Sequence, residues 1–314
     1  GSPTNALESA PAPTSDAVAS GQKTTSTAPI APMKTRMARS VPNALRQIID
    51  HKLEEIRLIK QAQPLEALRE MISERRIPRN FFAAVTRSEK ATRPAIIAEV
   101  KRKSPSAGWI RPEFADDSGF DPVSIARQYH EAGARAISCL TDERFFGGKL
   151  EYIDRIRDAV PIPVLRKDFI IDPYQVWESR AAGADAILLI AECLREAELL
   201  DLMILAHELK LTVLLEVHSS DNLFRVLPHV GFPKPSYTLL GINNRDLETM
   251  TTDVAHTLRL VDMIEDTSVL VSESGISEPE HLKKLHKAGV HIALVGESLM
   301  RTESPGQALR ELLA

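Results

Sequence analysis

Residues 121–140, DPVSIARQYHEAGARAISCL, contain in order the start of a helix, its end and a buried strand. An acidic residue followed by proline is a typical helix start, and an Ala-Gly pair is a typical helix end. The apolar run AISCL follows directly, as when a crossover helix returns the chain to a parallel sheet. The same start and end signals recur at 172–183 and 278–289, each before another apolar run.

Working outward from this unit, short apolar runs alternate with helical patterns along the rest of the chain. The runs occupy residues 95–100, 136–140, 163–168, 186–192, 212–217, 238–244, 269–274 and 292–297. Strands that are apolar on both faces and separated by helices indicate a parallel sheet covered by helices, and eight such units close into a barrel. A doubly wound open sheet is the alternative, but EVKRKSPSAG at 99–108 lacks its glycine-rich first turn. We therefore predict an α/β fold, a (βα)8 TIM barrel.

The N-terminal part of the chain differs from the rest. Residues 1–40 are rich in Ala, Pro, Ser and Thr, which predicts a disordered tail or an added or targeting extension. Apolar residues then recur at helical spacing, at Leu45, Ile48, Ile49, Leu53 and Ile56. This spacing predicts an extra amphipathic helix at 43–59. Residues 41–314 are expected to form a single barrel domain that includes the N-terminal helices.

Composition excludes several classes of function. The net charge is −4 with both signs mixed along the 314 residues, so neither nucleic acid nor a membrane surface is an expected partner. The two cysteines, Cys139 and Cys193, lie beside predicted strands and suit buried, reduced positions. The nine histidines lack ligand spacing, so we predict no metal, and the expected partner is a small molecule. A cytoplasmic location is expected, or a plastid one if the tail is a transit peptide.

Charged residues gather at the carboxyl ends of the predicted strands. Glu99 and Lys101 are two residues apart, so both are expected to point into the mouth of the barrel. Further polar residues end other strands, at Lys167, Glu216, His218, Asn243, Asn244, Arg245, Glu273 and Ser274. Lysines and glutamates in one cavity can donate protons, accept protons and recognise a carboxylate. Alternation turns Arg166 and Asp168 away towards the helices, and His218 alone is expected to be structural.

Two glycine-containing motifs suggest a phosphate site. SESG at 272–275 and VGES at 295–298 place glycines directly after the seventh and eighth strands. Barrels of this kind often bind phosphate there through backbone N–H groups and a helix N-terminus. Lys103 and Ser104 could add a charge and a hydroxyl to the same anion.

Seven motifs, in order, carry a family resemblance: IAEVKRKSPSAGWI, LTDERFFGG, VLRKDFIID, LLEVHS, GINNRDL, VSESGI and LVGESLM. From about Ala44 to the C-terminus the chain resembles indole-3-glycerol phosphate synthase. The resemblance implies a step of tryptophan biosynthesis, in which 1-(2-carboxyphenylamino)-1-deoxyribulose 5-phosphate closes to indole-3-glycerol phosphate. Carbon dioxide and water are lost, and no cofactor is implied.

The resemblance also implies catalytic roles. Lys167 would be the general acid that protonates the ribulose carbonyl as the carbon–carbon bond forms. Lys101 would hold the substrate carboxylate and take part in later proton transfer with the help of Glu99. Glu216 would act as base or proton shuttle in the dehydration. Asn243 would orient the anilino or hydroxyl groups.

The implied binding residues surround these groups. Arg245 would help to bind the carboxylate, and Phe146 would pack on the aromatic ring. Contacts to the phosphate and sugar would come from Lys103, Ser104, Ser274, Gly275 and Gly296. Glu297 is excluded from the site, because a carboxylate in this region would repel phosphate unless it turned away. Gly147 and Lys149 stand where a smaller, more polar pattern is expected, so the loop after the second strand is expected to differ in shape.

Three alternatives remain open. The chain could be a neighbouring isomerase, a Schiff-base aldolase that uses Lys167, or a non-catalytic phosphate binder on the same fold. We expect a monomer that could associate with other enzymes of the tryptophan pathway. The family also implies that the 43–59 helix borders the active-site mouth. Deleting the chain to about Ala62 should then raise KM more than it lowers stability.

Overall fold

The computed structural model describes residues 41–86 and 91–314. The tail expected at 1–40 lies outside this described part of the chain. Within it, no helix is both long and apolar enough to cross a membrane.

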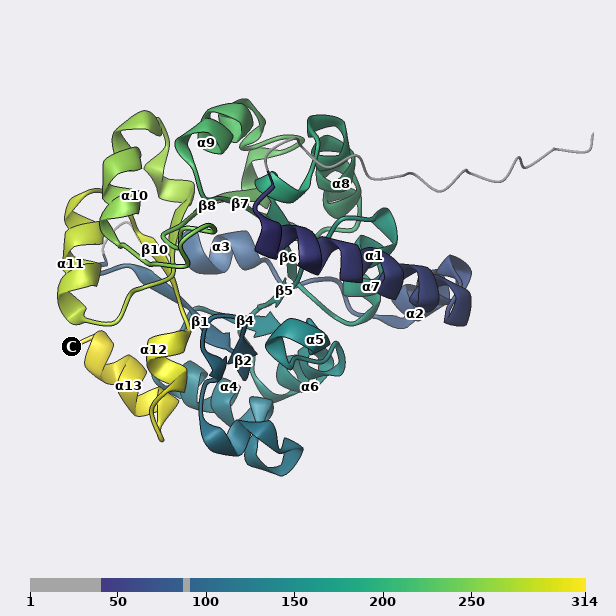
Figure 1. Cartoon of the computed structure of the whole chain (residues 1–314), viewed down its shortest axis with the longest axis horizontal. Coiled ribbons are helices and arrows are strands. Elements are labelled where there is room, and N and C mark those ends of the chain that lie inside the picture. Colours follow the sequence, from purple (N-terminus) through teal and green to yellow (C-terminus); the bar gives the residue numbers. More distant parts are fainter. Residues whose placement is uncertain (1–40, 87–90) are drawn as a thin grey trace, which may run out of the picture. The chain divides into compact units, whose positions relative to one another are not determined.

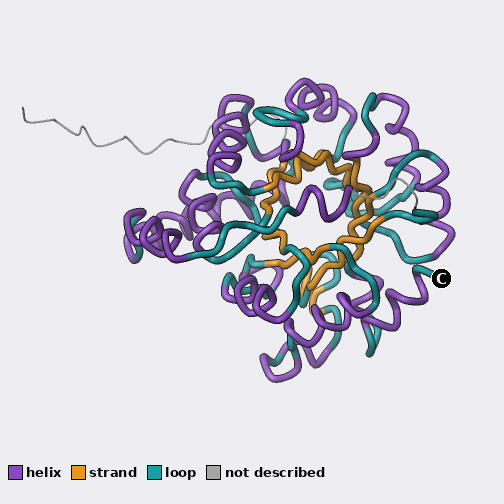
Figure 2. Tube along the Cα trace, turned by 180° about the vertical axis from the view of Figure 1, so that it is seen from behind, coloured by secondary structure: helices purple, strands orange, loops and turns teal. Residues whose placement is uncertain are grey.

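Eight parallel strands form a closed barrel, which confirms the predicted fold (Figure 2). They are β1 (Ala95–Val100), β4 (Ala136–Leu140), β5 (Val164–Lys167), β6 (Ala186–Ile190), β7 (Thr212–Val217), β8 (Thr238–Asn243), β9 (Leu270–Glu273) and β10 (Ile292–Val295). The barrel closes because β1 pairs with β4 on one side and with β10 on the other. Nearly every strand residue is buried, since the strands face the barrel interior on one side and helices on the other.

Helices surround the ring of strands (Figures 1 and 2). Those that follow β1 to β10 along the chain are α4 (Pro122–Glu131), α5 (Glu143–Phe146), α6 (Glu151–Ala159), α7 (Pro173–Ala181), α8 (Glu196–Glu208), α9 (Ser220–Val226), α10 (Ala255–Leu260), α11 (Pro279–Lys287), α12 (Glu297–Met300) and α13 (Pro305–Leu312). The Asp121 side chain caps α4 by accepting from the N–H groups of Val123 and Ser124. The glycines that end α4, α7 and α11 all have positive φ, as their Ala-Gly pairs predicted.

Three helices precede the barrel, of which the sequence analysis placed one, at 43–59. They are α1 (Asn43–Ala62), α2 (Leu65–Glu74) and α3 (Phe81–Thr86). The Phe82 N–H donates to Thr212 Oγ1, at the first residue of β7, so α3 covers the amino end of the barrel. The opposite end receives α1, whose Leu45 and Ile48 line the cavity at the carboxyl ends of the strands. This position confirms that the predicted helix borders the mouth of the barrel.

Local features differ from the predicted strands. The run predicted at 292–297 ends at Val295, and Glu297 begins α12. After β1 the chain forms a small antiparallel hairpin of β2 (Lys103–Ser104) and β3 (Gly108–Trp109), too short to show a period in the sequence. The run predicted as a strand at 186–192 ends at Ile190, because Ala191–Cys193 turn into a short 3-10 helix, η3. Cys139 and Cys193 are buried free thiols, as expected.

Candidate active site

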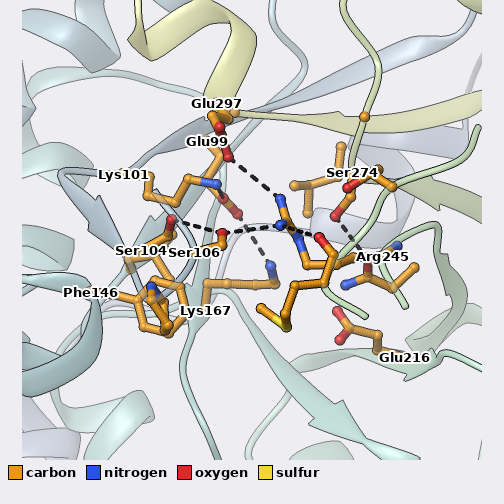
Figure 3. A pocket seen from close by; sticks show the side chains of 18 of the residues that line it. Glu99, Lys101, Ser104, Ser106, Phe146, Lys167, Glu216, Arg245, Ser274 and Glu297 are labelled. Atoms are coloured by element: carbon orange, nitrogen blue, oxygen red, sulfur yellow. Dashed lines mark hydrogen bonds and ion pairs between the residues drawn. The ribbon is translucent and has the colours of Figure 1, made fainter. Parts of the chain in front are cut away.

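A cavity of about 460 Å³ opens at the carboxyl ends of the strands. It is lined by eleven of the twelve residues to which the family resemblance gives a role: Glu99, Lys101, Ser104, Phe146, Lys167, Glu216, Asn243, Arg245, Ser274, Gly275 and Gly296. Figure 3 shows how several of these side chains converge from different strands. The volume is in the range of a site that encloses a small organic ligand.

Lys103 is the predicted residue that does not line the cavity. It neighbours Ser104 on β2, and successive side chains on a strand point to opposite faces. Ser104 faces the cavity, so Lys103 points the other way, with its Nζ 5.1 Å from the centre of the Trp109 ring and 3.4 Å from the Arg144 carbonyl oxygen. The expectation that Lys103 faces a phosphate in this cavity is therefore corrected.

Glu99 joins two lysines at the floor of the cavity. Its carboxylate lies 3.3 Å from Lys167 Nζ and 3.5 Å from Lys101 Nζ, and it accepts from Ser138 Oγ at 2.9 Å. Burial lowers the pKa of Lys101 below its ordinary value, and Glu99 offsets this only in part. Burial acts on Lys167 in the same direction, but the surrounding carboxylates, led by Glu99, outweigh it and raise its pKa. Lys167 is therefore a charged proton donor at neutral pH.

Glu216, at the end of β7, is buried on another wall of the cavity. Its Oε1 lies 3.4 Å from His218 Nε2, and the Nδ1 of the same ring lies 3.2 Å from Glu192 Oε2. Burial would raise the pKa of Glu216, but His218 and Lys167 keep it below its ordinary value. The site thus holds an ionised carboxylate as well as a charged lysine, which is an acid and a base in one cavity.

Sequence reasoning did not assign Glu192, His218 or Glu273 to the site. His218 lines the cavity rather than serving only as a buried structural residue. Glu273 is 1% exposed at the end of β9. Its position at the end of a strand was the sequence signal that could have assigned Glu273 to the site. Glu192 gave no such signal, because the strand was expected to continue through it.

Asn243 and Arg245 form the polar wall at the end of β8. Asn243 Oδ1 accepts from the Ser274 hydroxyl at 2.8 Å and from the Arg245 N–H at 3.0 Å. The Arg245 guanidinium donates to Ser106 Oγ at 3.1 Å and to the Met250 carbonyl at 3.3 Å. These bonds fix both side chains in the cavity wall, and Figure 3 marks the bond from Arg245 to Ser106.

Glu297 lines the cavity and does not turn away from it. Its carboxylate lies 2.5 Å from Arg301 Nη2 and 3.5 Å from Arg245 Nη2, so two arginines neutralise it. By contrast, neither Gly147 nor Lys149 lines the cavity. Gly147 ends α5, and Lys149 pairs with Asp117 at 3.1 Å.

Arg166 makes the structural contacts that strand alternation predicted. Asp168 makes such contacts too, but it also lines the cavity, which corrects the expectation that it turns away. Arg166 pairs with Glu178 of α7 at 2.8 Å and with Asp168 at 3.2 Å. Asp168 also pairs with Lys52 of α1 at 3.1 Å and accepts from the Thr141 hydroxyl at 2.6 Å. The network ties α1 and α7 to the strand that carries Lys167.

The Asp168 network predicts a loss of stability in acid. Burial would raise the pKa of Asp168, but Arg166 and Lys52 lower it from 3.8 to about 2. Because the folded pKa lies below the unfolded one, the stabilisation is complete above about pH 5 and is lost as the pH falls towards 2, at a cost of about 2 kcal/mol. Urea unfolding across this range should show Asp168→Asn losing less stability with falling pH than the unmodified protein. Equal slopes would contradict the prediction.

Metal ligation has little support in the geometry. Within 41–86 and 91–314, no group of three or more His, Cys, Asp or Glu side chains is arranged to hold a metal ion.

Comparisons with known proteins agree with one another. The family model described as indole-3-glycerol phosphate synthase matches residues 45–312. The indole-3-glycerol phosphate synthase of Acidithiobacillus ferrooxidans (strain ATCC 53993 / BNL-5-31) is 46% identical over 268 residues, covering 85% of this chain and 97% of the relative. The enzyme of the same name from Bacteroides thetaiotaomicron is 44% identical over 269 residues, covering 86% and 97%.

Solved structures with low sequence identity show the same fold. A mutant tryptophan synthase alpha-subunit from Pyrococcus furiosus superposes with a TM-score of 0.51 at 14% identity, covering 70% of this chain and 97% of that one. The 3-hexulose-6-phosphate synthase of Salmonella typhimurium has a TM-score of 0.53 at 11% identity, covering 69% and 96%. At these identities the likeness concerns the barrel alone.

Proposed function

The chain belongs to the indole-3-glycerol phosphate synthase family, and from this premise we propose how its cavity residues carry out the family's reaction. The enzyme is a decarboxylating carbon–carbon lyase of tryptophan biosynthesis. It closes 1-(2-carboxyphenylamino)-1-deoxyribulose 5-phosphate to indole-3-glycerol phosphate and releases carbon dioxide and water. The observation that carries the proposal is a charged Lys167 and an ionised Glu216 in one cavity.

In the ring closure, Lys167 protonates the ribulose carbonyl oxygen while the aromatic carbon attacks the carbonyl carbon. The 3.3 Å contact with Glu99 holds the ammonium in place and supports this role. Lys101 faces the same carboxylate and would bind the substrate carboxylate until it leaves as carbon dioxide. Both lysines are charged partners for developing negative charge inside a partly buried site.

In the dehydration that follows, Glu216 accepts a proton from the intermediate while Lys101, assisted by Glu99, donates one to the hydroxyl group, which leaves as water. Its ionised state supports the role of base, and Asn243 offers an amide group fixed by Ser274 to orient the intermediate. Arg245 would help to bind the carboxylate, and Phe146 would pack on the aromatic ring. Phosphate and sugar contacts are assigned to Ser104, Ser274, Gly275 and Gly296.

Replacing Arg245 with lysine is expected to raise KM about tenfold, which corresponds to about 1.4 kcal/mol, with a smaller effect on kcat. The guanidinium reaches Ser106 and Met250 at the same time, and an ammonium group cannot keep both bonds while binding an anion. Steady-state kinetics measure the change. Arg259→Lys is the matched control, because Arg259 pairs with Asp253 on the surface. An unchanged KM in Arg245→Lys would refute the role.

An aldolase that forms a Schiff base is the competing function. Such a lysine needs a lowered pKa to be a nucleophile, whereas the carboxylates around Lys167 raise its pKa. Borohydride treatment in the presence of a carbonyl substrate would trap an adduct on Lys167 if the aldolase were correct.

The reaction is tested by the rise of indole fluorescence after the purified protein is mixed with 1-(2-carboxyphenylamino)-1-deoxyribulose 5-phosphate. We expect turnover without added metal or cofactor, and no signal would count against the proposed function. Four other statements stay predictions. They are that residues 41–314 form a single domain, that the protein is a monomer, that it associates with pathway enzymes, and that it is located in the cytoplasm.

A further inference from the structure

Two buried carboxyl groups, those of Glu216 and Glu273, lie next to each other near the carboxyl ends of β7 and β9. Gly241 of β8 is the register partner of Glu216 on β7. A side chain at Gly241 would collide with Glu273 Oε1, so the Glu273 carboxyl occupies the space over this glycine. Neither oxygen of Glu273, nor Oε2 of Glu216, has a hydrogen-bond partner among the described residues. A buried carboxylate without a donor is costly, so this pair requires an explanation.

A single proton on the pair removes the difficulty. Two carboxylates only accept hydrogen bonds and repel each other, whereas a protonated carboxyl can donate to its ionised neighbour. The count of local charges also favours one bound proton, because four carboxyl groups face three basic groups. The carboxyl groups are Glu99, Glu192, Glu216 and Glu273, and the basic groups are Lys101, Lys167 and His218. One bound proton makes this cluster neutral.

His218 distinguishes the two members of the pair. It follows Glu216 by two residues, and its ring lies between two carboxylates, 3.4 Å from Glu216 Oε1 and 3.2 Å from Glu192 Oε2. Glu192 also accepts from the His218 backbone N–H at 2.8 Å, and His256 Nε2 bonds to the His218 carbonyl at 2.8 Å. A ring whose two nitrogens both face carboxylates is best satisfied when both carry protons, that is, as the cation.

We propose that His218, charged and held by Glu192, makes Glu216 the ionised member of the Glu216–Glu273 pair and leaves the proton on Glu273. His218 is thus a positioning residue that keeps Glu216 ready to act as a base. The inference rests on the proposed function, because that function makes Glu216 the base. The pKa directions agree, since burial and then Glu216 raise the pKa of Glu273 well above its ordinary value.

The proposal requires different effects from two substitutions. Removing the His218 charge with His218→Asn leaves Glu216 without its nearest cation, so the Glu216 pKa rises. Glu273→Gln removes no charge, because Glu273 is already protonated where Glu216 titrates, and the amide can still donate to Glu216, so the Glu216 pKa hardly changes. The acid limb of the kcat/KM profile should move to higher pH in His218→Asn, by about one unit, and stay in place in Glu273→Gln.

The test compares kcat/KM against pH for the unmodified enzyme and three variants. His229→Asn is the matched control, because His229 pairs with Glu196 at 2.9 Å outside the cavity, and its limb should not move. An unmoved limb in His218→Asn would overturn the inference. A shift to lower pH in Glu273→Gln would also overturn it, because that shift would show that Glu273 is ionised in the unmodified enzyme. A structural role of His218 alone would lower activity without moving the limb.

A second measurement does not depend on turnover. Infrared spectra at neutral pH should show a protonated-carboxyl C=O band that disappears in Glu273→Gln, and its absence from the unmodified protein would overturn the inference. If the unmodified enzyme makes no indole product, the proposed function fails, and the infrared result still decides whether Glu273 holds a proton. The two failures are therefore distinguishable.

Discussion

Replacing Lys167 with alanine is expected to lower kcat by about 10²–10⁴-fold, the usual contribution of a general acid, which would leave turnover close to undetectable. Lys167 is 16% exposed and points at Glu99, so water does not easily take its place. The carbonyl oxygen would then gain negative charge without a proton donor. Indole fluorescence under saturating substrate measures the loss.

A control variant and a stability measurement distinguish loss of the general acid from misfolding. Lys149→Ala is the matched control, because Lys149 pairs with Asp117 outside the cavity and should keep normal activity. The thermal unfolding midpoint of Lys167→Ala should stay near that of the unmodified enzyme, since Glu99 keeps Lys101 and the Ser138 hydroxyl as partners. Full activity in Lys167→Ala would show that Lys167 is not the general acid.

The sequence predicted the barrel because each βα unit carries its own local signals. These signals are apolar runs, acidic or proline helix starts and Ala-Gly helix ends. Each involves only a few neighbouring residues, so it can be recognised without knowledge of the tertiary structure. Strand alternation also placed Glu99 and Lys101 in the cavity and directed Arg166 towards α7. These predictions depended only on the period of a regular strand.

Prediction failed where the regular strand stopped. Lys103 was predicted to face the cavity, but the β2–β3 hairpin turns its side chain away. The hairpin is too short to produce a period in the sequence, so this turn could not be predicted. Glu192 became a partner of His218 only because η3 bends the chain after β6. The sequence excluded Glu297 because its charge would repel an anion, but Arg301 lies beside it and neutralises that charge. Each of these depends on contacts between distant or irregular segments.

The N-terminal helix contains a further residue that the sequence did not single out, Lys52. It lies four residues after Ile48 and three after Ile49, so helical spacing alone places it on the buried face of α1. Its side chain is 1% exposed, and its Nζ lies 2.9 Å from Asp142, 3.1 Å from Asp168 and 3.1 Å from Glu55. These carboxylates belong to α1 and to the segments after β4 and β5, so one lysine joins three parts of the site.

This position revises the expected effect of deleting α1. The helix buries five side chains, Leu45, Ile48, Ile49, Lys52 and Ile56. Its loss would also leave Asp142 and Asp168 without their shared cation. A deletion to about Ala62 is therefore expected to lower stability at least as much as it raises KM, contrary to the expectation from the sequence.

Replacing Lys52 with methionine should lower the free energy of unfolding by about 3–5 kcal/mol, the usual cost of removing one partner from a buried ion pair. Methionine keeps most of the chain length and removes the charge, so the loss reports on Asp142 and Asp168. Unfolding in urea measures it, provided that the slope against denaturant is unchanged. Lys60→Met on the same helix is the control, because Lys60 pairs with Asp172 while 44% exposed, and it should cost at most about 1 kcal/mol.

The two variants together test whether α1 is part of the active-site architecture. If Lys52→Met is no less stable than Lys60→Met, the buried network is not what holds α1 to the barrel. If it is less stable as expected, kcat should fall as well, because Asp168 directly follows Lys167 and loses one of the two cations that hold it. A loss of stability with unchanged kcat would show that Arg166 alone is enough to keep the general acid in place.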